Sequence, residues 1–437
     1  MWLVSHACLR GRSRGRSPAR RVGPILRPAM AEKGKAFAAG AAPTWRITGN
    51  LLMVALVAGT AGAPIVGALR ESVQESYGIP FWAIGAGVAA LGALAGVVGL
   101  AVTWRLPGVG RMTFIRTGMI VFMSGFLTFY LLPESPGPLA LAMLAAGWFV
   151  LTFGRCLAAI SNAVFTDLWS HRPHTGVILL HAVNSIGKLL APLAALVLLA
   201  LRPNALLYSG ILAVLVLDAL TWPRASVAAL NVTARDRPVG EAAGAIIRRP
   251  LFWLMCAEFL LIGGSEAGVA SILPSFIERH RLPAAGLSPR RWSEVVLVAM
   301  HLGIVAGRFG GVLVSRRLGE RPIIMACLLC GLAVVPAVAS ASPAVYLPCF
   351  FVLGLAFSAT WPAHFALMAR RFPHDKTVLS MGAAMGTLAG VNGFVLLSSL
   401  IGNDPGRLPW AIVISTAGMG VFAVSFFALP RGKAAHE

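Results

Sequence analysis

Twelve apolar stretches, each long enough to cross a lipid bilayer, constrain the fold of this chain more than any other feature. A membrane-spanning helix needs about 20 mainly apolar residues. The stretches cover residues 47–69, 81–104, 112–133, 139–166, 176–201, 204–223, 251–277, 295–315, 322–340, 344–369, 377–401 and 408–430. They lack the alternating pattern of barrel strands, so the sequence predicts an all-α membrane protein with twelve transmembrane helices.

The composition agrees with a chain that is solvated mainly by lipid. Charged residues make up 12% of the chain, against about 25% in soluble domains, and hydrophobic residues make up 57%. With the N-terminus placed in the cytoplasm, cytoplasmic segments hold 26 Lys and Arg residues and external loops hold 7. Positive residues collect on the cytoplasmic side, so both termini are predicted to be cytoplasmic in a bacterial inner membrane. The external loop with Arg279, Arg281, Arg290 and Arg291 departs from this rule.

The helices divide into two pseudo-symmetric bundles of six, with predicted boundaries as follows. Residues 1–43 form a basic, disordered segment, 44–223 the first bundle, 224–250 a cytoplasmic linker, 251–430 the second bundle and 431–437 a tail. Residues 1–29 hold seven arginines and no acid, which fits either a targeting segment or untranslated sequence before a start at Met30. Two similar six-helix halves are typical of a transporter with a central site.

The sequence predicts no enzyme. A nucleotide-binding loop, a nucleophile elbow and a zinc-protease helix are all missing from supporting contexts, so we expect no catalytic residues, cofactor or metal. Cys327 and Cys330 lie in an apolar helix and are interpreted as packing residues. The net charge of +21 follows from the cytoplasmic segments, so nucleic acid is not an expected partner.

One turn carries a recognisable pattern. The stretch GRFGGVLVSRRLGERP (307–322) resembles a loop signature of the major facilitator superfamily, G-x-x-x-D-R-x-G-R-R. Gly311, Arg316 and Gly319 match this signature, and Ser315 replaces its acid. We interpret these residues and Arg308 as a gating or loop motif, with Arg308 tying the turn together. The alternative is an ordinary positively charged cytoplasmic turn.

Four further stretches are similar to the branch of sugar–proton symporters that includes fucose permease: ISNAVFTDL (160–168), LLHAVNSIGKLLAP (179–192), IGGSEAGVASILPSFI (262–277) and GLAFSATWPAHFALM (354–368). The resemblance implies the major facilitator fold and proton-coupled transport of a monosaccharide or polyol. Fucose permease carries carboxylates in its first and fourth helices, whereas Pro64 and Ala158 stand near those positions here. Sugar specificity therefore does not transfer with the resemblance.

Charged residues inside the predicted helices mark the candidate site. A charge at the bilayer centre costs about 2.5–3.5 kcal/mol, so it needs a partner or a wet cavity. Lys188 and Glu266 lie near their helix centres, and Arg155 lies just beyond its own. Asp218 and Glu258 lie nearer helix ends, where snorkelling or interfacial pairing is expected.

Polar residues recur at helical spacing around these charges, at i, i+3 and i+7 on helix 176–201. The predicted substrate-binding or coupling residues are Arg155, Asn162, His181, Asn184, Lys188, Glu266, Trp361, His364 and Asn392. Two interpretations stay open: these residues line a central cavity, or Glu266 neutralises Lys188 or Arg155 in a structural pair without substrate contact. Trp361 either stacks a sugar or gates the pathway, or else packs in the core.

The sequence thus predicts a secondary active transporter that moves a small polar solute by alternating access. The resemblance favours a sugar-like solute, whereas Arg155 and Lys188 against Glu266 favour an organic acid. We expect proton coupling through Glu266, His181 or His364, and a monomer whose partners are the solute, the proton and the lipid bilayer. The alternatives are proton-driven efflux of hydrophobic compounds and, less favoured, a non-transporting membrane sensor.

Overall fold

The computed structural model describes 41–60, 77–79, 81–106, 109–133, 135–169, 173–198, 244–279, 286–314, 318, 320–340, 342–358, 360–371, 379–385, 407–410, 412–414, 416 and 420. Within these ranges the regular structure is helical, which confirms the all-α fold class. The chain divides into the units Met1–Trp45 and Arg46–Glu437, and every contact below lies within the second unit.

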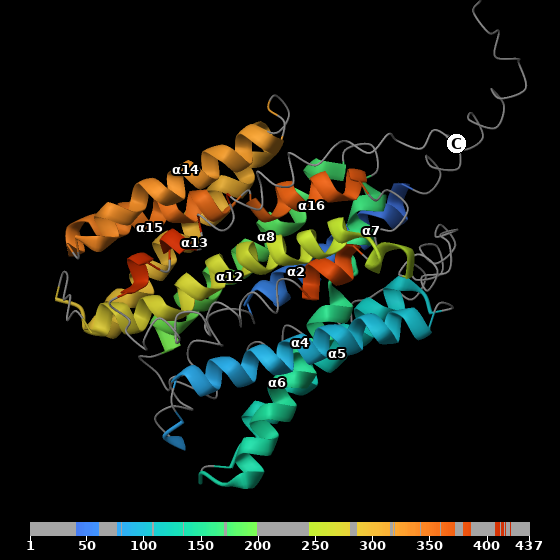
Figure 1. Ribbon diagram of the computed structural model, residues 1–437, viewed down its shortest axis with the longest axis horizontal. Helices are drawn as coiled ribbons and strands as arrows, with labels where there is room; N and C mark the ends of the chain where they lie inside the picture. The colour runs from blue at the N-terminus through green and yellow to red at the C-terminus, as the bar shows by residue number, and fades with distance from the viewer. Residues whose placement is uncertain are drawn as a thin grey trace, which may run out of the picture. The chain divides into compact units, whose positions relative to one another are not determined.

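In the first half of the chain, the structure describes six helices (Figure 1). They are α2 (Ala41–Thr60), α4 (Phe81–Arg105), α5 (Arg111–Tyr130), α6 (Pro138–Ala158), α7 (Ser161–Leu168) and α8 (Pro173–Leu198). Five helices describe the second half: α12 (Pro250–Arg279), α13 (Pro289–Val314), α14 (Glu320–Ala339), α15 (Pro343–Ser358) and α16 (Thr360–Arg371). The predicted stretch 204–223 lies outside the described residues, and the last two stretches are described only in part.

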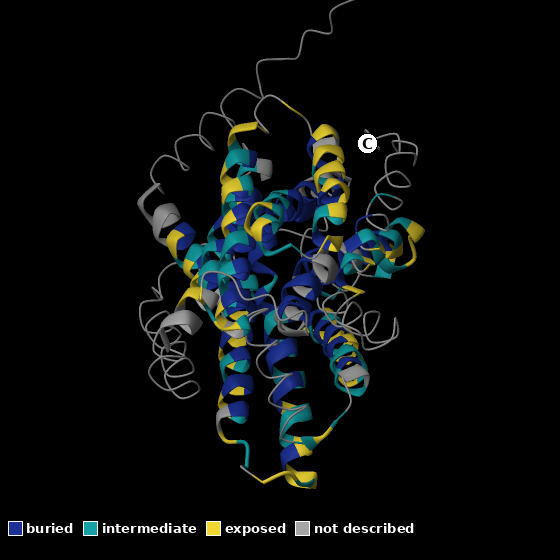
Figure 2. Ribbon diagram, turned by 90° about the vertical axis from the view of Figure 1, so that its left-hand side faces the viewer, coloured by how far each residue is buried: buried dark blue, intermediate teal, exposed yellow. Residues whose placement is uncertain are grey.

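The described helices coincide with the predicted membrane stretches. Six of the described helical segments are long and apolar enough to cross a bilayer. Their surfaces carry large exposed apolar side chains, among them Leu139 at 67% exposure, Leu313 at 65% and Leu329 at 63%. Single helices show buried residues on one side and exposed residues on the other (Figure 2). Exposed apolar faces of this kind are stable against lipid tails, where no hydrophobic penalty applies.

One predicted helix is interrupted in the structure. The stretch 139–166 was predicted as continuous, but α6 ends at Ala158 and α7 begins at Ser161. The Asn162 side-chain amide donates to the carbonyl of Ala159 at 2.9 Å, which satisfies a helix-end carbonyl at the break.

Close backbone approach positions α13 against α15. A Cβ atom added to Gly303 would lie 2.1 Å from the carbonyl oxygen of Phe351, and one added to Gly354 would lie 2.0 Å from that of Met300. Glycine at both positions lets the two backbones meet, as small residues do in membrane helix pairs. Since α13 also packs on α8, this contact places side chains of α13 between α8 and α15.

Candidate functional site

Arg308 occupies the centre of a polar cluster rather than the turn to which it was assigned from the sequence. Its side chain is 2% exposed. It donates from Nε to the Ser358 carbonyl at 2.9 Å and from a terminal nitrogen to the His181 carbonyl at 2.7 Å, and it also bonds the Ser185 hydroxyl. The assignment of Arg308 to the turn was wrong because its planar fork reaches across from α13 to α8 and α15.

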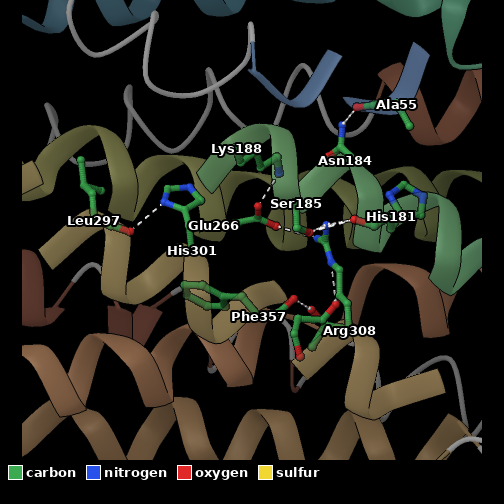
Figure 3. Close-up of polar contacts among 12 residues, drawn as sticks. Ala55, His181, Asn184, Ser185, Lys188, Glu266, Leu297, His301, Arg308 and Phe357 are labelled. Carbon is green, nitrogen blue, oxygen red and sulfur yellow. Dashed lines mark hydrogen bonds and ion pairs between the residues drawn. The ribbon is translucent and has the colours of Figure 1, made fainter. Parts of the chain in front are cut away.

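Glu266 is the carboxylate that Arg308 and Lys188 share. Lys188 forms an ion pair with one carboxylate oxygen, and Arg308 donates to the other at 3.2 Å (Figure 3). The three side chains are 2–13% exposed. They come from α8, α12 and α13, so the cluster joins a helix before the predicted linker to two helices after it. A buried charge requires such pairing, because removing one partner leaves the other charge buried and unpaired.

Two further basic groups surround this cluster. His301 is 1% exposed and interacts electrostatically with Glu266. Its Nδ1 bonds the Leu297 carbonyl at 2.8 Å, so Nδ1 carries the proton and Nε2 is an acceptor that no described group satisfies. Half-buried Arg155 also interacts electrostatically with Glu266, and no hydrogen bond joins its guanidinium to another described residue.

The formal charge of this cluster is therefore positive. Arg155, Lys188 and Arg308 contribute three positive charges and Glu266 one negative charge, which leaves +2 among these four described residues. The sequence analysis weighed only Arg155 and Lys188 against Glu266, because it assigned Arg308 to the turn. An arrangement with more cations than anions in a low-dielectric interior attracts an anion.

His181 and Asn162 form a second polar contact beside the cluster. His181 Nε2 lies 2.9 Å from the Asn162 Oδ1 atom. Because the Asn162 amide nitrogen already donates to Ala159, its oxygen is the acceptor and His181 Nε2 carries a proton. The His181 ring packs on Trp361, with centroids 4.0 Å apart.

Trp361 lies in an aromatic group. It is 8% exposed, stacks on Phe365 with centroids 5.5 Å apart and packs on Phe259 at 5.1 Å. These contacts occupy much of the ring surface, which favours the packing interpretation over stacking with a sugar.

Asn184 serves helix packing in the described structure. Its side-chain amide donates to the carbonyl of Ala55 on α2 at 2.8 Å. The backbones are close here, because a Cβ atom added to Gly59 would lie 1.9 Å from the Asn184 carbonyl oxygen. Asn184 lies on α8 with His181 and Lys188 but bonds a different neighbour, so its role in the site stays a prediction.

The partner of His364 is Glu258. Snorkelling or interfacial pairing was expected for Glu258. Its side chain is 0% exposed, so it does not snorkel, and it pairs with His364. The two helices that carry this pair, α12 and α16, pack against each other. The remaining predicted residues make no described contact with the polar cluster. Gly311 lies in α13, and Asn392, Arg316 and Gly319 lie outside the described residues.

Sequence spacing carried a signal for the residues that were missed. Arg308 follows His301 by seven residues, and Glu266 follows Glu258 by eight, so each pair lies on one side of its helix. Ser185 follows His181 by four and donates to its carbonyl at 2.8 Å. The same helical rule that selected Lys188 therefore also selects Arg308 and Glu258.

Comparisons with known proteins agree with this architecture. The sequence profile of the Major Facilitator Superfamily matches residues 51–397. No curated protein sequence matches the chain. Among solved structures, the transporter FucP in its outward conformation is 17% identical, with a TM-score of 0.62 over 88% of this chain and 98% of that one.

Two other solved structures share the fold at lower identity. The nucleoside transporter NupG is 14% identical, with a TM-score of 0.60 over 88% of this chain and 98% of that one. A bacterial homologue of the iron transporter ferroportin is also 14% identical, with a TM-score of 0.63 over the same shares. At these identities the likeness shows the fold alone. Because the family profile spans most of the chain, this protein belongs to the major facilitator superfamily.

Proposed function

We propose that this protein is a secondary active transporter that carries a small organic acid across the membrane by alternating access, coupled to protons. The observation that carries the proposal is the cluster in which Lys188 and Arg308 share the single carboxylate of Glu266. With Arg155 nearby, two positive charges stay without a counter-charge among these residues. A solute carboxylate supplies one, and Arg308 suits carboxylate geometry.

A hydroxylated acid fits the cluster better than a plain one. His301 Nε2 is a buried acceptor with no partner among the described groups, and a solute hydroxyl is a donor. Satisfying such a buried group favours binding, because leaving it unpaired costs about 1–3 kcal/mol. A sugar acid combines the carboxylate that the charges call for with the hydroxyls of the sugar-like solutes that the sequence resemblance implied. The solved fucose:proton symporter FucP supports a sugar-like skeleton only through its fold.

Uptake into proteoliposomes tests the solute class. The probes are radiolabelled D-gluconate and L-lactate as anions, with D-glucose and L-fucose as neutral sugars. We expect uptake of an anion that rises with an inward proton gradient and falls on addition of a protonophore. Uptake of only the neutral sugars would leave the excess positive charge without a role and would contradict the proposal.

A charge variant separates solute binding from structural pairing. Lys188→Met keeps the length of the side chain and leaves Glu266 bonded to Arg308. If Lys188 binds the solute, the folded variant loses anion uptake by at least tenfold. Arg105→Met, which removes an exposed cation at the end of α4, is the matched control and keeps uptake. Normal anion uptake by Lys188→Met would assign the Lys188–Glu266 pair to structure alone.

A further inference from the structure

Glu258 and His364 form an acid–base pair away from the cationic cluster. Glu258 lies on α12 and His364 on α16, and their side chains are 0% and 2% exposed. The ion pair with His364 Nε2 is the one polar contact that the Glu258 oxygens make with described residues, and neither oxygen makes a hydrogen bond of good geometry. The cationic cluster does not use this pair, and Glu258 precedes Glu266 by eight residues, which is about 12 Å of helix.

The protonation of this pair follows from the second ring nitrogen. His364 Nδ1 lies 2.6 Å from the carbonyl oxygen of Thr360. A carbonyl oxygen only accepts, so Nδ1 carries a proton. In a neutral ring Nε2 is then a bare lone pair, which repels a carboxylate. The contact between Nε2 and Glu258 is therefore attractive only when one proton lies on the carboxyl group or on Nε2.

Burial holds that proton in place. With one shared proton the pair is neutral overall, either as acid and imidazole or as carboxylate and imidazolium. Without the proton it would leave a negative charge that no water solvates, and such a charge is expensive in a protein interior. A proton shared by this pair leaves only when the pair is opened to water or to another base.

The groups that face the pair do not replace His364. From α13, His301 and Arg308 interact with Glu266 rather than Glu258. From α15, Tyr346 packs on Phe276, near the other end of α12.

On α12 itself, Cys256 lies closest along the chain to Glu258. It donates to the carbonyl of Gly382 at 3.8 Å, so it is turned toward a different neighbour. Among the described residues, His364 is thus the titratable group in contact with Glu258.

Packing links the pair to the cationic cluster. Trp361 lies one turn before His364 on α16, and its ring packs on His181 of α8. The His181 carbonyl in turn accepts a hydrogen bond from Arg308. His181 and Trp361 therefore form a continuous path of contacts from Arg308 to α16.

We propose that Glu258 and His364 form the proton-binding site of this transporter, holding one exchangeable proton apart from the site that binds the solute. The proton enters or leaves when α16 moves relative to α12. Its coupling role rests on the proposed transport function, whereas proton binding by the pair does not.

The thermal unfolding midpoint as a function of pH tests proton binding without any solute. Between pH 7 and 9 the unfolded chain has an ionised Glu258 and a neutral His364, and so holds no proton there. The proposal places one proton on the folded pair, and it therefore predicts that the stability of the wild type falls as pH rises. Glu258→Gln supplies an amide donor to Nε2 and needs no proton. We expect the wild-type midpoint to fall relative to that of Glu258→Gln across this range.

The control and a second variant make the test decisive. Asp167→Asn removes an acid that pairs with Arg111 near the surface, and its midpoint should run parallel to that of the wild type. If Glu258→Gln does not fold, the double variant Glu258→Leu/His364→Leu removes both polar groups together and takes its place. Midpoints of the variant and the wild type that stay parallel from pH 7 to 9 would overturn the proposal.

Transport measurements then test the coupling role. With D-gluconate or L-lactate, whichever the wild type carries, Glu258→Gln should exchange labelled for unlabelled solute at a rate within about twofold of the wild type. Accumulation driven by a proton gradient should be lost. Proton-driven accumulation that survives in Glu258→Gln contradicts the coupling role. If the wild type carries no probe, the proposed function fails, while the unfolding profile still decides whether the pair binds a proton.

Discussion

At the scale of single residues, the protein concentrates its polar chemistry in side chains that bond across helices. Arg308 satisfies two backbone carbonyls, a hydroxyl and a carboxylate, whereas Lys188 contributes one ion pair. Arg308 therefore holds more of the cluster together than Lys188 does, although both contact Glu266. A substitution of Arg308 should disturb the cluster most, because only a guanidinium reaches all four groups.

Substitutions at the two cations should rank in that order. Arg308→Lys leaves carbonyls of Ser358 and His181 unsatisfied and weakens the pairing of Glu266, so we expect a loss of about 3 kcal/mol in unfolding free energy. Lys188→Met leaves the bond from Arg308 to Glu266 in place and should cost roughly 1–2 kcal/mol. Thermal unfolding in detergent measures both. If Lys188→Met lost as much unfolding free energy as Arg308→Lys or more, Lys188 would be the residue that stabilises the cluster most.

His301 offers a test of solute selectivity. His301→Leu removes the unpartnered Nε2 acceptor, and one hydrogen bond of about 1.4 kcal/mol corresponds to a tenfold change in affinity. We expect the KM for D-gluconate to rise by roughly tenfold while that for acetate, which has no hydroxyl, stays within twofold. Equal changes for the two anions would mean that His301 shapes the cluster without contacting a hydroxyl.

At the scale of helices, close backbone contacts decide where the polar side chains meet. Glycines allow α13 to lie directly on α15, and Arg308 then reaches the Ser358 carbonyl at the end of α15. A break between α6 and α7 similarly places Asn162 where it meets His181. The site therefore depends on helix spacing as much as on the identity of its charged groups.

Two glycines of α13 provide a matched comparison. Gly303→Ala would place its Cβ 2.1 Å from a backbone oxygen of α15, so the helices must separate and the unfolding midpoint should fall by several degrees. Gly310→Ala meets no atom within 4 Å and gains helix propensity, so its midpoint should stay or rise. The two variants differ only in position. A harmless Gly303→Ala substitution would show that the contact between α13 and α15 is looser than the structure indicates.

At the scale of the whole molecule, the cluster joins helices from the two predicted bundles. Lys188 belongs to the predicted bundle 44–223, and Glu266 and Arg308 belong to the predicted bundle 251–430. Alternating access requires such bundles to move against each other, so a cluster of this kind would have to rearrange during transport. In the proposed function, competition between a solute anion and Glu266 for its cations drives this rearrangement.

The orientation of the chain in the membrane is a separate prediction. Lys and Arg accumulate in the predicted cytoplasmic segments, so an epitope tag at either terminus should be cut by protease in inside-out vesicles and protected in right-side-out vesicles. A tag inserted in the predicted external loop near Gly286 is the control and should show the reverse. Tags on the two termini that differ in accessibility would imply an odd number of membrane crossings.

Length and hydropathy were enough to predict the helices in the part of the chain that the structure describes. A bilayer demands about 20 apolar residues for each crossing, and this requirement is local, so it can be read without knowing any neighbour. The same holds for Lys188 and Glu266, because a charge far from either interface needs a partner wherever its helix lies. The sequence therefore predicted both residues as central, and their ion pair was one of the two interpretations that it left open.

Only the tertiary structure decided which polar side chains contact one another. Arg308 and Glu258 lie near predicted helix ends, where sequence allows snorkelling, and only the packing of α13 against α8 and of α16 against α12 buries them. The amino-acid sequence determined which segments cross the membrane, since that depends on each segment's own transfer energy. Which polar groups meet depends on contacts between distant segments, and those exist only in the folded protein.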